Sequence, residues 1–282
     1  MGLGNLLGEL RAVRELATFA TDTILNPDPG KSPHGSETGA IPAGILLIPG
    51  FMASDVTLYP LARRLRQSGH QVFFAGIWCN ADCPIRTVAY LEQALRDGAH
   101  EAGGKVVVIG HSLGGLYARE LAKVFPELVE RAILLGAPLR SPVDAVNPPI
   151  RAMADLMFTL HKPCLNQFDG LFHEAGRGLP PVPPEVPETI VYTRSDGIVD
   201  WRSCLENGPN VEAVEVAGSH CGLAMSVEVW DVIKSRLGHV PATQQPETRA
   251  RNGIRPRRSP LKPPSRLRPS YLRLVKGPSS AA

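Results

Sequence analysis

A serine, an aspartate and a histidine in this chain each follow an apolar segment, in an order suited to nucleophilic catalysis. A serine hydroxyl is a weak nucleophile at neutral pH. It needs a base to take its proton, an acid to orient that base, and donors for the oxyanion. The sequence offers Ser112 as the nucleophile, Asp196 as the acid and His220 as the base. We therefore predict a Ser–Asp–His catalytic site.

Ser112 lies in the sequence GHSLGG at residues 110–115. The apolar run at 105–109 predicts a strand and residues 113–125 predict a helix, which together are the strand, turn and helix of a nucleophile elbow. Gly110 and Gly114 flank the serine because a side chain there would collide with the crossing strand and helix. His111 is expected to point away from the site. An inert serine in a glycine-rich turn is the alternative.

The acid is predicted from the loop that follows the apolar strand at 189–193. Asp196 in this loop can reach a histidine on the next loop. Asp200 is the rival, although N-capping of the short segment from Trp201 would explain it. A turn with Gly197 would equally explain Asp196. The loop pattern favours Asp196.

The base is predicted to be His220, which follows the last strand at 211–216 and precedes the final helix at 227–237. Small neighbouring residues would let its imidazole enter a crowded site. Strand, loop and chain order agree only for this histidine. The remaining candidates lie in loops, at helix ends, in the 138–187 insertion or near the C-terminal tail: His34, His70, His100, His161, His173 and His239.

Two backbone N–H groups are predicted to form the oxyanion hole. One belongs to Leu113, directly after the nucleophile. The other belongs to Phe51, in the loop after the first strand, where Gly50 lets the backbone turn inward. Phe51 and Met52 are also expected to bind substrate by lining the acyl pocket. Ordinary packing is the alternative for both side chains.

Strands and helices alternate along residues 41–240. Continuous apolar strands, rather than alternating ones, indicate a sheet covered by helices on both faces. The expected strands span 44–49, 71–77, 105–109, 131–136, 189–193 and 211–216, and the helices span 56–67, 85–102, 113–125 and 227–237. The sequence therefore predicts an α/β domain.

Residues 138–187 interrupt this alternation and form an insertion at the carboxyl edge of the sheet, where ligands bind in open α/β folds. The insertion holds a helical stretch at 150–161 and a proline-rich run at 180–187. We interpret it as a cap or lid, with a surface excursion as the alternative. Its apolar side chains are expected to need burial: Met153, Leu156, Met157, Phe158 and Leu160.

The two ends of the chain differ from the body. Residues 1–26 have helical apolar spacing and residues 27–40 read as a loop, so 1–40 is expected to be an amphipathic helix and a loop. This helix packs on the body, or alternatively lies on a membrane surface. Residues 241–282 carry a net charge of +9, which leaves −6 for the rest. We expect disorder in this basic tail, with weak contact to anionic surfaces as the alternative.

Composition favours a cytoplasmic protein, with peripheral membrane contact as the alternative. Residues 1–10 have no basic n-region, so we expect no secretory signal, and no apolar run is long enough to span a bilayer. Cys79 and Cys83 have no second pair at zinc spacing, so free thiols in a reduced compartment are favoured. A disulfide between Cys204 and Cys221 is the minority alternative. We expect neither metal nor cofactor and no nucleic-acid partner; no oligomeric state follows from the sequence.

Taken together, these motifs resemble the α/β-hydrolase superfamily, specifically its bacterial lipase- and esterase-like members. GHSLGG resembles the lipase elbow. Residues 49–51 resemble the oxyanion turn, with Pro49 in place of the usual histidine. Residues 195–199 and 218–222 resemble the acid and histidine loops. The resemblance covers roughly residues 40–240. It implies the α/β-hydrolase fold, with a mostly parallel central sheet and a small cap insertion.

The resemblance also implies hydrolysis of a carboxylic ester through an acyl-enzyme. The apolar insertion favours an apolar small-molecule ester or lipid over a charged substrate. An acyltransferase or a thioesterase would use the same triad. A non-catalytic lipid- or membrane-surface-binding protein on the same fold is the alternative from another class.

Overall fold

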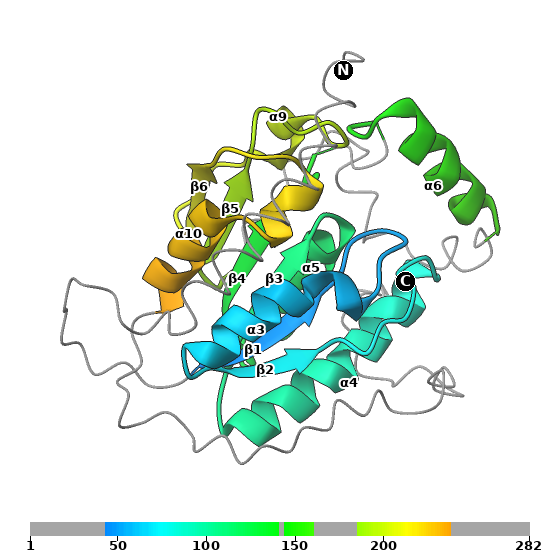
Figure 1. Cartoon of the computed structure of the whole chain (residues 1–282). Helices are drawn as coiled ribbons and strands as arrows, with labels where there is room; N and C mark the ends of the chain where they lie inside the picture. The colour runs from blue at the N-terminus through cyan, green and yellow to red at the C-terminus, as the bar shows by residue number, and fades with distance from the viewer. Residues whose placement is uncertain (1–42, 141–143, 161–184, 238–282) are drawn as a thin grey trace, which may run out of the picture.

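A computed structural model describes residues 43–140, 144–160 and 185–237. Its strands form one parallel sheet in the order β2-β1-β3-β4-β5-β6 (Figure 1). The bounds are β1 Gly44–Ile48, β2 Gln71–Phe74, β3 Val106–His111, β4 Val129–Leu135, β5 Glu188–Tyr192 and β6 Val211–Glu215. The expected α/β class with a parallel central sheet is confirmed.

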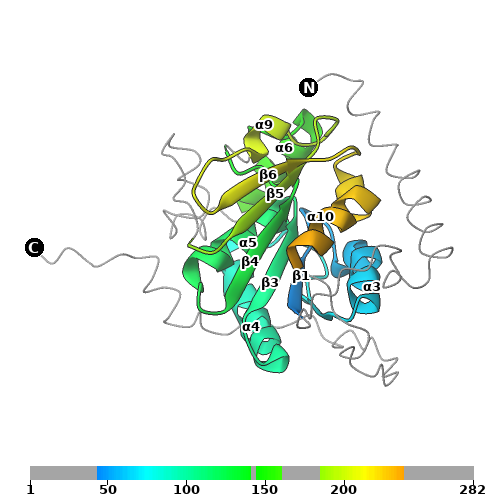
Figure 2. The ribbon, with the colours of Figure 1, turned by 90° about the vertical axis from the view of Figure 1, so that its left-hand side faces the viewer.

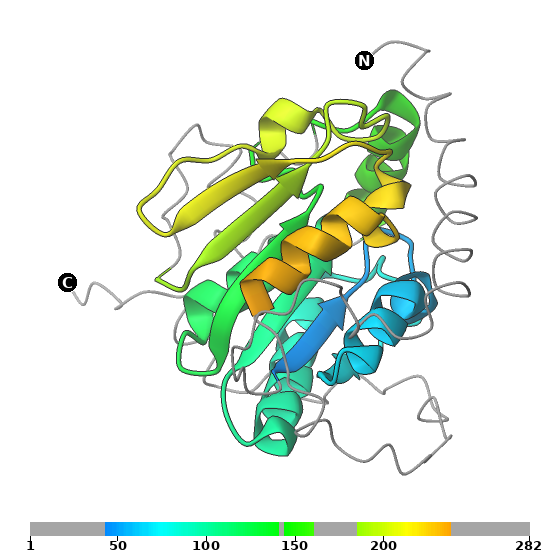
Figure 3. The same ribbon diagram turned by 60° about the vertical axis from the view of Figure 1, so that its left-hand side comes forward.

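Helices cover both faces of this sheet (Figure 2). Helices α3 (Tyr59–Gln67) and α10 (Val227–Leu237) bury Leu65 and Ile233 on one face. Helices α4 (Pro84–Ala102) and α5 (Leu113–Val124) bury Leu91 and Leu121 on the other. Figure 3 shows α10 lying across the sheet with α3 beside it. Strands apolar on both sides are what this two-sided cover requires.

Short segments between these elements differ from the predicted pattern. The strand expected at 71–77 ends at Phe74, because the chain turns through Gly76 at a φ of +78°. The 3-10 helix η1 (Asp55–Leu58) precedes α3. Two further one-turn segments, α9 (Trp201–Cys204) and η2 (Cys221–Ala224), follow the predicted acid and base loops.

The strand order reverses between β1 and β3. Strand β1 pairs with β2 on one side and with β3 on the other, always in parallel. The loops that leave the carboxyl ends of β1 and β3 therefore diverge and open a crevice, as at other topological switch points. Phe51 follows β1 and Ser112 follows β3. The topology thus brings the predicted oxyanion loop beside the predicted nucleophile.

The insertion contains helix α6 (Pro148–Leu160), close to the expected 150–161. The prediction that its apolar side chains are buried is wrong for Met153, Leu156 and Leu160, which are 40%, 52% and 63% exposed. Helix α6 turns a narrow face toward the body through Ile150 and Ala154, one turn apart. The side chains of Met157 and Phe158 lie outside the description.

The start of the insertion is joined to the loop that carries Asp196. Val146 and Val199 form an antiparallel bridge, and the Asp200 N–H donates to the Ala145 carbonyl at 2.7 Å. The buried Asn147 side chain donates to the Gly197 carbonyl at 3.0 Å and accepts from the Ile150 N–H at 3.1 Å. One asparagine therefore caps α6 and holds the acid loop.

Several expectations fall on residues that the structure does not describe: the helix and loop of 1–40, most of the proline-rich run, and the basic tail. They remain predictions. Among the helices of the described ranges, none combines the length and apolar character needed to cross a bilayer.

The cysteines depart in part from the expected thiol pattern. Cys83 takes part in a disulfide bond, so the expectation of a free thiol holds for Cys79 and is wrong for Cys83. No disulfide joins Cys204 to Cys221. Burial raises the pKa of the Cys204 thiol, which keeps this group protonated and inert.

A buried ion cluster lies between α5 and the start of β5. The Arg119 Nε lies 3.2 Å from Glu188 Oε2, and the same guanidinium contacts Glu206. All three side chains are at most 5% exposed. Burial raises the pKa of Glu188 to about 7; Arg119 opposes this rise, while Glu206 adds to it. One arginine therefore offsets two buried carboxylates only in part.

This cluster predicts a stability that falls as pH rises. The pKa of Glu188 is higher in the folded than in the unfolded chain, so between about pH 4.5 and 7 the unfolded state loses its proton first. In the wild type, the free energy of unfolding should fall by up to about 3 kcal/mol across this pH range, and Glu188→Gln should abolish that fall. Thermal unfolding below and above the range measures it.

Glu212→Gln is the matched control. Hydrogen bonding from Arg236 lowers the pKa of Glu212, so this replacement should leave the slope above about pH 5 unchanged. Equal pH slopes for the wild type and Glu188→Gln would contradict the prediction.

Candidate active site

Ser112 lies at a strained turn between β3 and α5. Its φ of +53° and ψ of −121° place a non-glycine residue in a region that L-amino acids rarely adopt. The turn cannot relax, because the two nearby glycines are packed tightly against other backbone segments. A Cβ on Gly110 would lie 2.1 Å from the Gly114 carbonyl oxygen, and one on Gly114 would lie 2.3 Å from the Ile48 carbonyl oxygen. The crowding predicted for these two glycines is therefore present.

The structure brings Asp196 and His220 together. Asp196 Oδ2 lies 2.6 Å from His220 Nδ1, and both side chains are at most 3% exposed. The second oxygen of Asp196 accepts from the N–H groups of Ile198 at 2.9 Å and Val199 at 2.6 Å. The carboxylate is thus fixed on both sides. Bonds to ionised acceptors of this kind are among the stronger ones in proteins.

Asp200, the rival acid, is engaged elsewhere. It is the N-cap of α9, and its Oδ1 accepts from the Arg202 N–H at 3.1 Å. Its side chain is 45% exposed, whereas that of Asp196 is buried. Asp200 therefore has the capping role that the sequence offered as its explanation.

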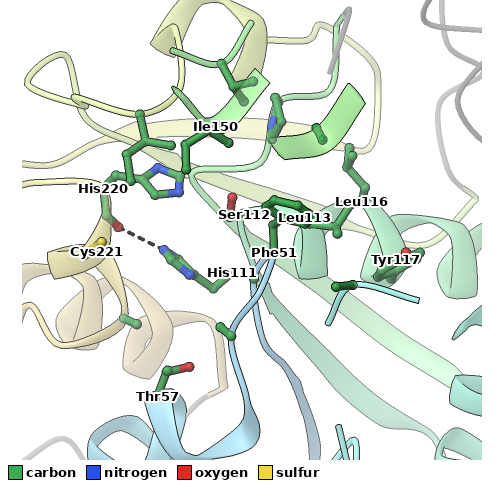
Figure 4. Close-up of a pocket in the computed structure, with 18 of the residues that line it drawn as sticks. Phe51, Thr57, His111, Ser112, Leu113, Leu116, Tyr117, Ile150, His220 and Cys221 are labelled. Carbon is green, nitrogen blue, oxygen red and sulfur yellow. Dashed lines mark hydrogen bonds between the residues drawn. The ribbon is translucent and has the colours of Figure 1, made fainter. Parts of the chain in front are cut away.

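The contact with Asp196 assigns the tautomer of His220. A carboxylate only accepts, so Nδ1 carries the proton and Nε2 of the neutral ring can accept one. Figure 4 shows Ser112 and His220 among the residues that line one pocket. A hydroxyl beside a carboxylate-oriented imidazole is the arrangement that activates a serine.

Phe51 and Leu113 both line this pocket next to Ser112. The turn and loop hydrogen bonds of the described residues use neither the Phe51 N–H nor the Leu113 N–H, whereas the Ser112 N–H donates to Leu135. Leu113 opens helix α5, where N–H groups have no intrahelical acceptor. Two backbone donors thus lie beside the serine, as expected for an anion-binding site.

Met52 does not lie where the sequence placed it. It is outside the pocket lining, and its side chain is 49% exposed. The backbone at Met52 has a φ of +58°, in the left-handed region. Of the two predicted substrate-binding side chains, the pocket includes Phe51 only.

His111 also departs from expectation, because it lines the pocket and packs on His220. The two ring centroids are 4.9 Å apart, and His111 Nε2 lies 2.9 Å from the His220 carbonyl oxygen (Figure 4). A carbonyl only accepts, so Nε2 of His111 donates. Burial, with His220 beside it, lowers the pKa of His111 to about 4. His111 is therefore neutral at pH 7 and anchors the loop of His220.

The pocket encloses about 490 Å³. Apolar side chains dominate its lining: Phe51, Val56, Leu113, Leu116, Pro138, Val146, Ile150, Ala154, Ile198 and Met225. Asp82 also lines it, but its carboxylate pairs with Arg86 at 3.3 Å. Within the described ranges, no group of three or more His, Cys, Asp or Glu side chains is arranged to hold a metal ion.

A model of the alpha/beta hydrolase family matches residues 45–251. The chain belongs to this family. The resemblance drawn from the motifs is thereby confirmed, together with the fold that it implied.

Solved structures provide a further comparison for this α/β-hydrolase. It is 18% identical to a structure of the metagenome-derived lipolytic enzymes LipS and LipT, over 71% of this chain and 94% of that one, with a TM-score of 0.50. Carboxylesterase CesB from Bacillus subtilis is 16% identical over 79% and 96% of the two chains, with a TM-score of 0.46. A search of curated proteins finds no match. At these identities the likeness concerns the fold.

Sequence reasoning missed the functional placement of two residues in this α/β-hydrolase. The sequence predicts that His111 points away from the site, but its ring bonds the loop of His220. Asn147 lay in the insertion with no motif around it, so nothing in the sequence linked it to the acid loop.

His111→Phe should slow the reaction of Ser112 with a fluorophosphonate probe by roughly tenfold. The phenyl ring fills the space but cannot donate to the His220 carbonyl, so the base loop loses an anchor, and small misplacements of reacting groups cost large factors in rate. His111→Gln, which keeps an N–H donor, should lose less.

His70→Phe is the matched control for packing loss. His70 is also buried with a pKa of about 4, but it bonds the Ala43 N–H at the start of the sheet. The His70→Phe variant should have a lower melting temperature and an unchanged rate of labelling at Ser112. Equal slowing by both phenylalanine variants would refute the anchoring role of His111.

Proposed function

We propose that this α/β-hydrolase is a serine carboxylic-ester hydrolase that acts through an acyl-enzyme on an uncharged, apolar ester. The observation that carries the proposal is the 2.6 Å contact between Asp196 and His220, buried beside a serine at a strained elbow. Such a pair serves to orient and stabilise an imidazole that takes up a proton. Ser112, Asp196 and His220 are accordingly assigned as nucleophile, acid and base.

In the acylation step, His220 Nε2 accepts the proton of Ser112 while Oγ attacks the ester carbonyl. The carbonyl oxygen becomes an oxyanion, which the N–H groups of Phe51 and Leu113 stabilise. Asp196 stabilises the imidazolium that forms at His220. When the tetrahedral intermediate collapses, His220 gives its proton to the leaving alcohol, and the acyl group remains on Ser112.

Deacylation repeats these steps with water as the nucleophile. His220 takes a proton from water as its oxygen attacks the acyl carbonyl, and the same two N–H groups stabilise the second oxyanion. The carboxylic acid leaves, and the proton returns from His220 to Ser112 Oγ. One ester and one water thus yield one acid and one alcohol.

The pocket supports an apolar substrate. Its lining is mainly aliphatic and aromatic, and Asp82, the carboxylate at its edge, is already paired. A charged acyl group would lose its hydration without gaining a partner there, which is unfavourable. A cavity of about 490 Å³ is within the usual range for small-molecule sites.

The proposed function is tested with p-nitrophenyl esters of increasing acyl length. The wild type should hydrolyse members of this series, and Ser112→Ala should abolish activity, with a loss of at least roughly 10⁴-fold in kcat. Ser68→Ala is the control, because its buried hydroxyl has no hydrogen-bond partner among the described residues and lies after α3. A wild type that hydrolyses no ester and takes up no fluorophosphonate at Ser112 would overturn the proposal.

Ala154→Phe should shorten the acyl groups that the enzyme accepts. Ala154 faces the pocket from α6, so a phenyl ring there fills space that a longer chain would occupy. We expect kcat/KM to fall roughly tenfold for the octanoate and to stay nearly constant for the acetate. Met153→Phe, on the neighbouring residue outside the lining, should change neither value. Unaltered octanoate turnover by Ala154→Phe would place the acyl chain elsewhere.

A further inference from the structure

A buried asparagine outside the predicted motifs holds the loop that carries Phe51. Asn80, on the loop between β2 and α4, is 1% exposed. Its side-chain Nδ2 donates to the Pro49 carbonyl at 2.7 Å. Its backbone carbonyl accepts from the Met52 N–H at 3.0 Å, and its own N–H donates to the Ala53 carbonyl at 2.9 Å. One residue thus bonds the chain on both sides of Phe51.

The chemistry of Pro49 fixes the orientation of the Asn80 amide. The group facing Asn80 is a carbonyl oxygen, which only accepts, so the amide must present its NH₂ group. A carboxylate in the same position would present an acceptor to an acceptor. The contact with the Pro49 carbonyl therefore requires a hydrogen-bond donor at the position of Asn80 Nδ2.

The loop needs such a support. Met52 has a φ of +58°, which is unfavourable for a residue with a long side chain. Gly50 is packed against the nucleophile, since a Cβ there would lie 3.2 Å from Ser112 Cβ. The Phe51 N–H sits between these two constraints. A rotation of the neighbouring peptide would turn this donor away from the serine.

A second residue joins the same two loops. The Asp55 carboxylate accepts from the Gly76 N–H at 2.7 Å, and the Asp55 N–H donates to the Ile77 carbonyl at 3.0 Å. The loop from Ala75 to Cys83 therefore acts as a brace along the length of the oxyanion loop, and Asn80 is its contact nearest to Phe51.

We propose that Asn80 is a positioning residue that keeps the Phe51 N–H directed at the oxyanion formed during ester hydrolysis. The inference rests on the proposed function of the site. Asn80 itself touches no reacting atom. It acts by fixing the Pro49 carbonyl and the Met52 N–H, so that the peptide between them holds one orientation when charge develops.

Asn80→Asp is the most direct test, because it keeps the shape and both backbone bonds and replaces only the donor to Pro49. Oxyanion stabilisation acts in the transition state and not on bound ester. We therefore expect kcat to fall roughly 10- to 100-fold, with KM within about threefold of the wild type. Asn80→Ser, which is too short to reach Pro49 and adds no charge, should behave in the same way.

Two further readouts separate positioning from general loosening. The affinity of a boronic acid, which forms a tetrahedral adduct on Ser112, should fall by the same factor as kcat/KM across the variants. The pH dependence of kcat/KM should keep its acidic limb, because the Asp196–His220 contact is untouched.

Thr189→Val is the matched control. It removes a side-chain bond of another buried residue, from Thr189 Oγ1 to Glu212 at 2.8 Å, at the opposite end of the sheet. It should lower the melting temperature and leave kcat, KM and boronic acid affinity near wild-type values. All variants are compared at a temperature well below their melting points.

The outcomes are distinguishable. The role of Asn80 would be overturned, and the proposed function left standing, by either of two results in folded Asn80 variants. One is a kcat within about threefold of the wild type, and the other is a fall in kcat no larger than that of Thr189→Val. A shifted acidic limb would overturn it too, because the defect would then lie in the base. An inactive wild type with unlabelled Ser112 would reject the proposed function itself.

Discussion

The arrangement of this site depends on how closely helix α5 approaches the ends of β1 and β3. A Cβ on either Gly110 or Gly114 would overlap backbone atoms of the neighbouring segment. This approach forces the turn at Ser112 into its unfavourable φ, and that strain persists because apolar packing on both faces of the sheet holds the three segments together. The exposed hydroxyl and the N–H groups at the start of α5 follow from the same contact.

The electrostatics of the site follow from burial. Asp196 and His220 form a hydrogen-bonded pair removed from water, and His111 beside them stays neutral because burial lowers its pKa. A positive His111 would oppose the proton that His220 must accept. Another group of buried charges, Arg119 with Glu188 and Glu206, lies apart from the site at the start of β5. Asp196 and the neutral ring of His111 thus both lie in contact with the base.

Much of this was predictable from local patterns. Apolar runs located the strands, and glycine spacing marked the elbow, because these features depend on neighbours in sequence. The predictions for Met52 and His111 fail because their environments are set by distant segments, the loop at Asn80 and the carbonyl of His220. The prediction for Leu156 fails because α6 meets the body only through a narrow face. Asn80 and Asn147 gave no signal, because a side-chain bond to a distant backbone group leaves no periodic trace.

The bridge between Val146 and Val199 ties the start of the insertion to the acid loop, whereas the helix that follows it makes different contacts. Ala145, Val146 and Asn147 bond the loop that carries Asp196 and help to hold it in place. From Pro148 onward the chain forms α6, which meets the body through Ile150 and Ala154. Exchange of α6 would therefore change the pocket wall at Ile150 and Ala154 and leave the Val146–Val199 bridge in place. Helix α6 thus shapes part of the pocket, while the residues before it hold the acid loop.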